Sequence, residues 1–113
     1  MISFCETDME DIVRFELNGR LDAVGVDSIE APLTASVRKG NRNVLIDLAQ
    51  TPFVGSLGIR MLISAARILH RAGRTMMLTG VQPQVLEVFE TVSLGDLIPI
   101  VVDADEARAK LSA

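Results

Sequence analysis

The stretch from Asn43 to Gly73 constrains the fold of this chain more than any other segment. Its first part, Val44-Leu-Ile-Asp-Leu48, is mostly apolar and predicts a central strand covered on both faces. After a short loop, Ser56 opens a helix that runs to about Ala72 and ends at Gly73, since glycine is common just past a helix C-terminus. A buried strand that leads into a long helix is typical of layered α/β domains.

Strands and helices alternate along the rest of the chain. Apolar residues at every second position predict a strand at 12–18, which an acidic turn at 8–11 joins to a strand at 2–7 as an antiparallel hairpin. Further strands are expected at 75–79 and 98–102, and further helices at 26–40, 83–92 and 103–111. We therefore predict a single α/β domain over residues 1–113, with a mixed β-sheet, an N-terminal hairpin and helices packed on the sheet.

Two of the expected helices have residues that bear on their bounds and packing. Pro32 lies inside the first helical pattern, so either the regular helix begins only near Glu30 or its first turns are loose. The helix expected at 83–92 begins at Pro83 and has an apolar stripe formed by Val85, Val88 and Phe89, with Leu86 as a possible addition.

The composition narrows the classes of function. A net charge of −4 argues against general nucleic-acid binding, and no apolar run is long enough to insert across a membrane. The N-terminus has no basic region followed by an apolar stretch, so no signal peptide is expected. The single cysteine, Cys5, excludes an intrachain disulfide and favours a cytoplasmic protein, and its strand-like surroundings predict a buried side chain.

Catalytic chemistry has no visible basis in the sequence. The only histidine, His70, lies near a helix C-terminus, where a cation suits the helix dipole. No carboxylate pair, metal-ligand spacing or nucleophile–base pair stands out. We therefore expect a binding protein without catalytic residues, cofactor or metal.

One side of the helix after Ser56 concentrates basic residues in an otherwise acidic chain. At about 100° per residue, one set falls within about 80°: Ser56, Arg60, Ser64, Arg67, Arg71 and Arg74. The opposite side is the expected core face, with Met61 beside it and with Leu57 and Ile68 closer to the arginines. We interpret the basic side as a docking surface for a partner of opposite charge; a solvated face is the alternative.

Ser56 itself has two interpretations. As a helix-capping residue it would stabilise the helix by about 1 kcal/mol. As a phosphorylation site it would carry a charge of about −2 at the positive end of the helix dipole, one turn from Arg60. Because the dipole accepts that charge, phosphorylation is expected to change partner binding rather than folding.

The order of several short segments resembles a STAS domain, and specifically a stand-alone anti-sigma factor antagonist. Gly19-Arg-Leu-Asp22 is similar to the family's Gly-x-Leu-Asp, and Val44-Leu-Ile-Asp-Leu48 to its central strand. Phe53-Val-Gly-Ser-Leu-Gly-Ile59 aligns with the family's Phe-(Ile/Met)-Asp-Ser-Ser-Gly-Leu. Three later segments follow in the family's order: Arg71-Ala-Gly73, Val81-Gln-Pro-Gln-Val85 and residues 89–97.

The resemblance implies regulation of bacterial transcription by partner switching. The unphosphorylated antagonist binds an anti-sigma factor that is also a serine kinase, which frees the sigma factor. The kinase then phosphorylates the first serine of the Asp-Ser-Ser-Gly motif, and a phosphatase later reverses this step. That serine aligns with Ser56. The expected partner-binding residues are Asp22, Gly55, Ser56, Leu57, Gly58, Arg60, Met61, Ser64, Arg67 and Ile68.

Two positions depart from the family motif. Gly55 stands where the family has aspartate, and Leu57 stands where it has a second serine. These changes either retune the choice of partner or mean that phosphorylation has been lost and binding is constitutive. The alternative function is a STAS regulatory subunit of a transporter or other complex that phosphorylation does not control. The oligomeric state does not follow from the sequence.

Overall fold

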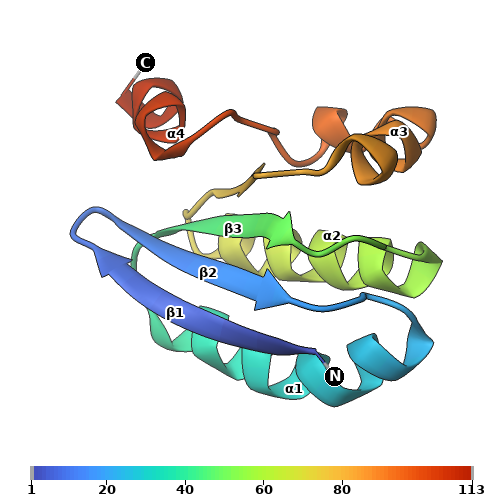
Figure 1. The fold of residues 1–113 in the computed structure, drawn as a ribbon. Helices are drawn as coiled ribbons and strands as arrows, with labels where there is room; N and C mark the ends of the chain where they lie inside the picture. Colours follow the sequence, from blue (N-terminus) through green and yellow to red (C-terminus); the bar gives the residue numbers. More distant parts are fainter. Residues whose placement is uncertain (1, 113) are drawn as a thin grey trace.

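One mixed β-sheet forms the centre of the molecule (Figure 1). The computed structural model describes residues 2–112. The strand order is β1-β2-β3-β4, formed by Ser3–Met9, Ile12–Asn18, Asn43–Gln50 and Met76–Thr79. β1 and β2 are antiparallel, whereas β3 is parallel to both β2 and β4. The predicted α/β class, N-terminal hairpin and mixed sheet are therefore confirmed.

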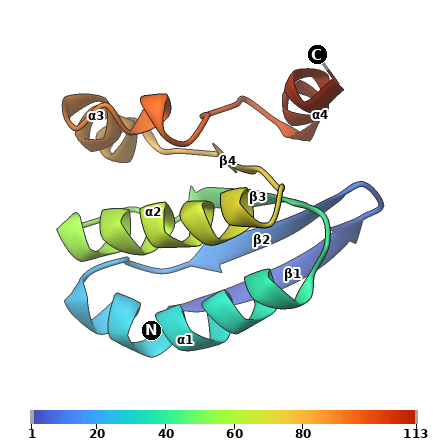
Figure 2. The same cartoon turned by 180° about the vertical axis from the view of Figure 1, so that it is seen from behind.

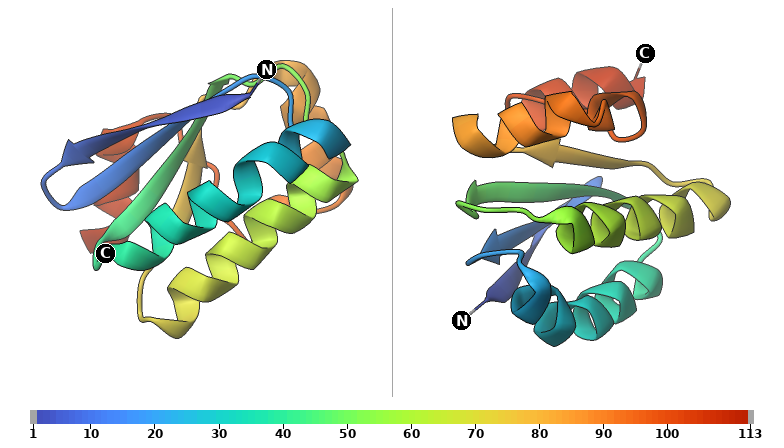
Figure 3. Two further views of the ribbon diagram at one scale, coloured as in Figure 1. Left: turned by 90° about the horizontal axis from the view of Figure 1, so that it is seen from below. Right: turned by 90° about the vertical axis from the view of Figure 1, so that its right-hand side faces the viewer.

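Helices cover both faces of the sheet. α1 (Ala23–Lys39) and α2 (Ser56–Arg71) lie side by side on one face, and Val85 and Phe89 of α3 (Pro83–Thr91) join the core on that face. α4 (Ala104–Ser112) packs on the other face (Figure 2). A short 3₁₀ helix, η1 (Leu94–Asp96), follows α3. The left view of Figure 3 shows α1 and α2 in front of the strands. α1 connects β2 to β3 and α2 connects β3 to β4, and right-handed crossovers that run in one direction across a sheet place both helices on the same face.

The main core lies between the sheet and the α1–α2 layer. Val13, Phe15 and Leu17 of β2 point into it, as the alternating pattern predicted, and β3 is buried on both faces from Val44 to Leu48. A smaller cluster on the opposite face seats α4; its members are Ile12, Leu45, Met77, Val101 and Ala107. The two clusters explain why β3 reads as a continuous apolar run.

α1 is longer than the position of Pro32 suggested. The helix starts at Ala23, so the first of the two alternatives, a start near Glu30, is wrong. Pro32 removes one backbone N–H donor inside the helix, but its ring is exposed to solvent. The helix continues through this position because buried residues on both sides of Pro32 pack on the sheet: Val26, Ile29, Leu33 and Val37.

The last expected strand, at 98–102, does not form. The chain makes a single parallel bridge there, between Ile100 and Leu78 of β4. The Leu78 N–H donates to the Pro99 carbonyl at 2.9 Å, and the Val101 N–H donates to the Leu78 carbonyl at 2.8 Å. Pro99 has no N–H to extend such a ladder, which confines the pairing to one bridge.

Two side chains that the sequence predicted to be buried are exposed. Val88 is 41% exposed, so the buried stripe of α3 consists of Val85 and Phe89 only. Cys5 is exposed because β1 is an edge strand and its neighbour Phe4 takes the side that packs on the core. The prediction that the Cys5 side chain is buried is therefore wrong.

Hydrogen bonds join α4 to the turn between β1 and β2. Arg108 of α4 donates from Nε to Asp11 Oδ1 at 3.1 Å and from Nη2 to the Met9 carbonyl at 3.2 Å. The hydrogen bond from Arg108 lowers the pKa of Asp11. The Glu10 N–H, and then the Arg42 guanidinium, lower the pKa of Asp8 in the same way.

Acid should therefore weaken the fold through these carboxylates. Because their pKa values are lower in the folded state, their stabilisation is present above about pH 4, the unfolded-state value, and is lost as the pH falls through the folded-state values. Urea titrations between pH 5 and 2 should show a smaller loss of unfolding free energy for Asp11→Asn than for wild type. Asp96→Asn, which changes a carboxylate outside the ion pairs of residues 2–112, is the control. An acid response of Asp11→Asn equal to wild type would contradict this account.

Candidate functional site

The loops that precede α1 and α2 meet at one end of the sheet (Figure 3). The Leu21 N–H donates to the Phe53 carbonyl at 2.9 Å, and the Gly55 N–H donates to the Leu21 carbonyl at 3.0 Å. Thr51 is fully buried, and its hydroxyl donates to the Leu17 carbonyl at 3.0 Å. These bonds satisfy the buried polar groups of both loops and hold the two helix starts in a fixed relation.

α2 approaches these loops at Gly58. A Cβ atom on Gly58 would lie 2.9 Å from Cγ1 of Val54 and 3.0 Å from the carbonyl oxygen of Leu21. Contacts this short are not tolerated without movement, so only glycine fits where α2 crosses the Leu21 loop. Gly58 is buried and supports the site by close packing; the expectation that it contacts a partner directly is wrong.

Ser56 is the first residue of α2, and Gly55 is its N-cap. The interpretation of Ser56 as the capping residue is therefore wrong. Its side chain is exposed, and its hydroxyl has no hydrogen-bond partner among the described residues. No side chain caps α2, so the backbone N–H groups of its first turn are left for solvent or a ligand.

Asp22 caps the neighbouring helix. Its Oδ1 accepts from the Gly25 N–H at 2.8 Å, and this hydrogen bond, followed by the nearby Arg20, lowers the pKa of the Asp22 carboxyl. Arg20 lies 3.6 Å from the Asp22 carboxylate and its guanidinium stacks 4.4 Å above the centroid of the Phe53 ring. The two loops are thus joined by side chains as well as by backbone bonds, and Asp22 is a structural member of the site.

Exposed apolar side chains surround the two helix starts. Val24 is 78% exposed, Phe53 39% and Leu57 42%. Leu57 was expected near the surface, whereas Val24, Phe53 and the stacked Arg20 were not identified as site residues from the sequence. Val24 lies outside the buried stripe of α1, which is the signal that could have placed it at the surface.

The exposed side of α2 agrees with the expected basic surface in most positions. Arg60, Ser64 and Arg67 are exposed and Ile68 is half-buried, as the helical pattern predicted. Met61 is only 2% exposed and packs in the core, so it cannot touch a partner. Arg74 lies beyond the helix end and donates to the Arg42 carbonyl at 3.3 Å, which removes it from this face.

The basic side chains on this face are not neutralised within the part of the chain that the structure describes. Arg60, Arg67 and Arg71 form no ion pair among residues 2–112. In the same range, no group of three or more histidine, cysteine, aspartate or glutamate residues could hold a metal ion. No helix within 2–112 has the length and apolar character needed to cross a membrane.

The amino-acid sequence is similar to one family model and to proteins named as anti-sigma factor antagonists. A family model described as STAS domain matches residues 7–107. BtrV of Bordetella bronchiseptica, provisionally named as an anti-sigma factor antagonist, is 30% identical over 93 residues, which cover 82% of this chain and 80% of BtrV. The anti-sigma-B factor antagonist of Staphylococcus aureus is 22% identical over 94 residues, which cover 83% of this chain and 87% of the relative.

The fold is also similar to that of a solved anti-sigma factor antagonist. The crystal structure of an anti-sigma factor antagonist from Mycobacterium paratuberculosis superposes with a TM-score of 0.85. The superposition covers 100% of this chain and 96% of that chain, at 18% sequence identity. This likeness extends the agreement to the arrangement of strands and helices.

The close approach at Gly58 gives a direct test of the site's construction. Gly58→Ala should lower the free energy of unfolding by about 1–3 kcal/mol, although alanine favours helices, because the added methyl meets the Leu21 backbone. Gly95→Ala is the matched control, since a Cβ atom there meets nothing within 4 Å. Denaturant unfolding of the two variants measures the difference. Equal stability of Gly58→Ala and wild type would show that α2 does not need this contact.

Proposed function

The chain belongs to the STAS domain family, and on this premise we propose that it is an anti-sigma factor antagonist that acts by partner switching. In this proposal the unphosphorylated protein binds an anti-sigma factor of the serine-kinase type. The kinase phosphorylates Ser56, binding is lost, and a phosphatase restores the binding form. The observation that carries the proposal is the exposed Ser56 hydroxyl, free of hydrogen bonds to the described residues, at the uncapped start of α2.

The start of α2 suits a phosphate. The N–H groups of the first turn have no side-chain cap, and Arg60 lies one turn further along the helix. A phosphate on Ser56 would meet the positive end of the helix dipole and these donors. The charge would therefore be accepted locally, while the surface offered to a partner would lose its net positive charge.

The two departures from the family motif are compatible with this role. Glycine at 55 provides no side chain to cap α2, so the first N–H groups stay available to a phosphate. Leucine at 57 is 42% exposed and adds to the apolar surface formed with Val24 and Phe53. We infer that Leu57 contributes apolar contact with the partner next to the site of modification.

The partner surface follows from what is exposed around Ser56. We define the α2 surface as Ser56, Leu57, Arg60, Ser64, Arg67 and Ile68. It offers unpaired guanidinium groups beside apolar side chains, which is the composition of interface anchors. The proposed partner therefore presents carboxylates around an apolar patch. Asp22 and Gly55 contribute by holding the two helix starts.

Phosphorylation at Ser56 can be tested directly. Incubation with the cognate serine-kinase anti-sigma factor and ATP should add one phosphate to wild type and none to Ser56→Ala, as measured by peptide mass spectrometry. The exposed Ser64 on the same helix face serves as an internal comparison. Phosphate on Ser64 alone, or no phosphate with a kinase that binds, would contradict the assignment and favour a STAS subunit of a transporter or other complex.

Charge reversal tests the α2 surface separately from phosphorylation. Arg60→Glu and Arg67→Glu should each weaken binding to the anti-sigma factor by about tenfold or more, because they place a carboxylate opposite the partner's acidic groups. Lys110→Glu changes an exposed cation of α4, on the opposite face of the sheet, and should leave the affinity within about twofold. Isothermal titration with the same partner preparation measures all three variants. Unchanged affinity in both α2 variants would identify this side as a solvated face.

A further inference from the structure

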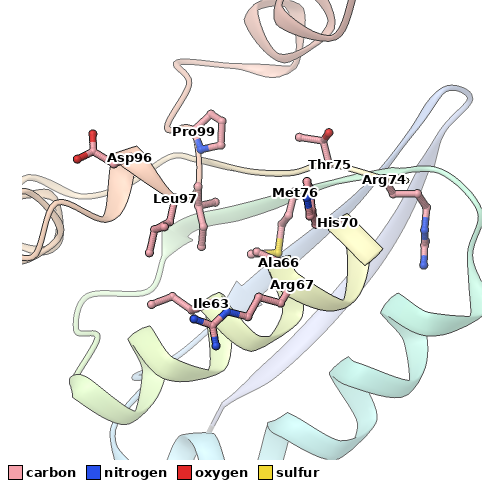
Figure 4. Close-up of a pocket in the computed structure, with 11 residues that line it drawn as sticks. Ile63, Ala66, Arg67, His70, Arg74, Thr75, Met76, Asp96, Leu97 and Pro99 are labelled. Atoms are coloured by element: carbon pink, nitrogen blue, oxygen red, sulfur yellow. The ribbon is translucent and has the colours of Figure 1, made fainter. Parts of the chain in front are cut away.

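A groove runs along the opposite border of α2 (Figure 4). Ile63 and Ala66 of α2 form one wall, Leu97 and Pro99 form the other, and Met76 of β4 lies at the floor. Its volume is about 300 Å³. Leu97 is 63% exposed, so a large apolar side chain stands uncovered at the mouth.

The wall opposite α2 is held in place by backbone bonds on both sides of Leu97. The Leu97 N–H donates to the Leu94 carbonyl at 2.9 Å, which closes the turn of η1. Pro99 accepts at 2.9 Å from Leu78 of β4, which ties the next part of the wall to the sheet. The groove is therefore preformed, as ligand sites in proteins usually are.

Basic groups stand on the α2 side of this groove. Arg67 and His70 line it, and within residues 2–112 neither side chain has a hydrogen-bond or ion-pair partner. The one carboxylate of the lining, Asp96, is directed away from the apolar walls (Figure 4). The groove thus combines apolar walls with donors that have no anion to bind.

We propose that this groove binds a small organic anion, a carboxylate carried on a short apolar chain. The chain lies on Met76 between Ala66 and Leu97, and the carboxylate accepts hydrogen bonds from the Arg67 guanidinium, which lies beside Ile63 (Figure 4). A guanidinium can hold a carboxylate with two parallel hydrogen bonds, which favours this head group. The inference goes beyond the proposed function and does not depend on it.

The volume of the groove and the side chains of its walls limit the class of ligand that it can bind. A volume of about 300 Å³ lies at the lower limit of ligand pockets, which favours a compact molecule. The thioether of Met76 is flexible and polarizable, so it adapts to an alkyl chain. Because Arg67 also belongs to the α2 surface, an occupied groove would remove that arginine from a partner.

Matched probe molecules test separately whether the groove binds the apolar chain and whether it binds the carboxylate. Octanoate is titrated into the full isotope-labelled chain, and amide chemical shifts are followed by NMR. Saturable shifts are expected at 63–70, 76 and 97–98. Octanol lacks the charge, acetate lacks the chain and octylammonium reverses the charge, so each should bind at least about fivefold more weakly. Equal binding of octylammonium, or shifts confined to other parts of the chain, would overturn the proposal.

Two variants locate the site. Ala66→Leu fills the groove with a good helix former and should weaken octanoate binding by about tenfold or more. Arg67→Gln should reduce the affinity for octanoate to that for octanol and leave octanol binding unchanged. Lys110→Gln, which changes an exposed cation of α4 on the opposite face of the sheet, is the control. Unaltered octanoate binding in both groove variants would contradict the site. The partner protein takes no part in this experiment, so its failure leaves the proposed function intact.

Discussion

The close contact of Gly58 with Leu21 and Val54 is the constraint on which the rest of the site depends. It allows the first turn of α2 to lie against the loop that leads into α1. The same loop is bonded to Phe53 and Gly55 through the backbone of Leu21. A bulkier residue at position 58 would push the helix away and break this arrangement. The two helix starts therefore form one rigid unit rather than two independent loops.

This construction assigns different tasks to residues that the sequence places together. Gly58 and Met61 face inward and hold α2 against the core, while Ser56, Arg60 and Arg67 face solvent. Asp22 has its carboxylate engaged by the start of α1. A charge added at Ser56 would meet donors that no other side chain uses. Such a site can change its surface charge without disturbing the packing beneath it.

The electrostatic contrast within the chain follows the same division. The protein carries a net charge of −4, yet the exposed side of α2 is basic and unpaired among the described residues. Elsewhere, arginines are joined to carboxylates: Arg108 to Asp11 and Arg42 to Asp8. These partnered arginines hold the fold together, whereas Arg60 and Arg67, which have no ion pair among the described residues, lie where we propose that other molecules bind.

Periodicity and termination signals explain what the sequence could predict. α2 was placed correctly at its start and ends within one residue of the expected Ala72, because Gly73 adopts φ +75 there and the apolar pattern is strong. Position-specific contacts could not be foreseen in the same way. Whether Gly55 or Ser56 caps α2 depends on backbone angles, and the exposure of Phe53 depends on which loop lies beside it.

Tertiary context decided the remaining differences. Residues 98–102 have a strand-like composition, but Pro99 and the edge of β4 allow only one bridge. Cys5 has apolar neighbours in sequence, but its strand lies at the sheet edge. Asp47 interrupts an apolar strand and is buried because Arg14 of the adjacent strand pairs with it across the sheet. These outcomes depend on strand order, which local patterns do not contain.

The central claim is that Ser56 stands on a rigid platform, so that its phosphorylation alters a surface and leaves the fold unchanged. An amide NMR spectrum of the phosphorylated protein, compared with that of the unmodified protein, tests this most directly. The account predicts shift changes confined to the first turn of α2 and the loops at 20–25 and 51–55. Changes that spread through α1 and the sheet, or a loss of spectral dispersion, would contradict it.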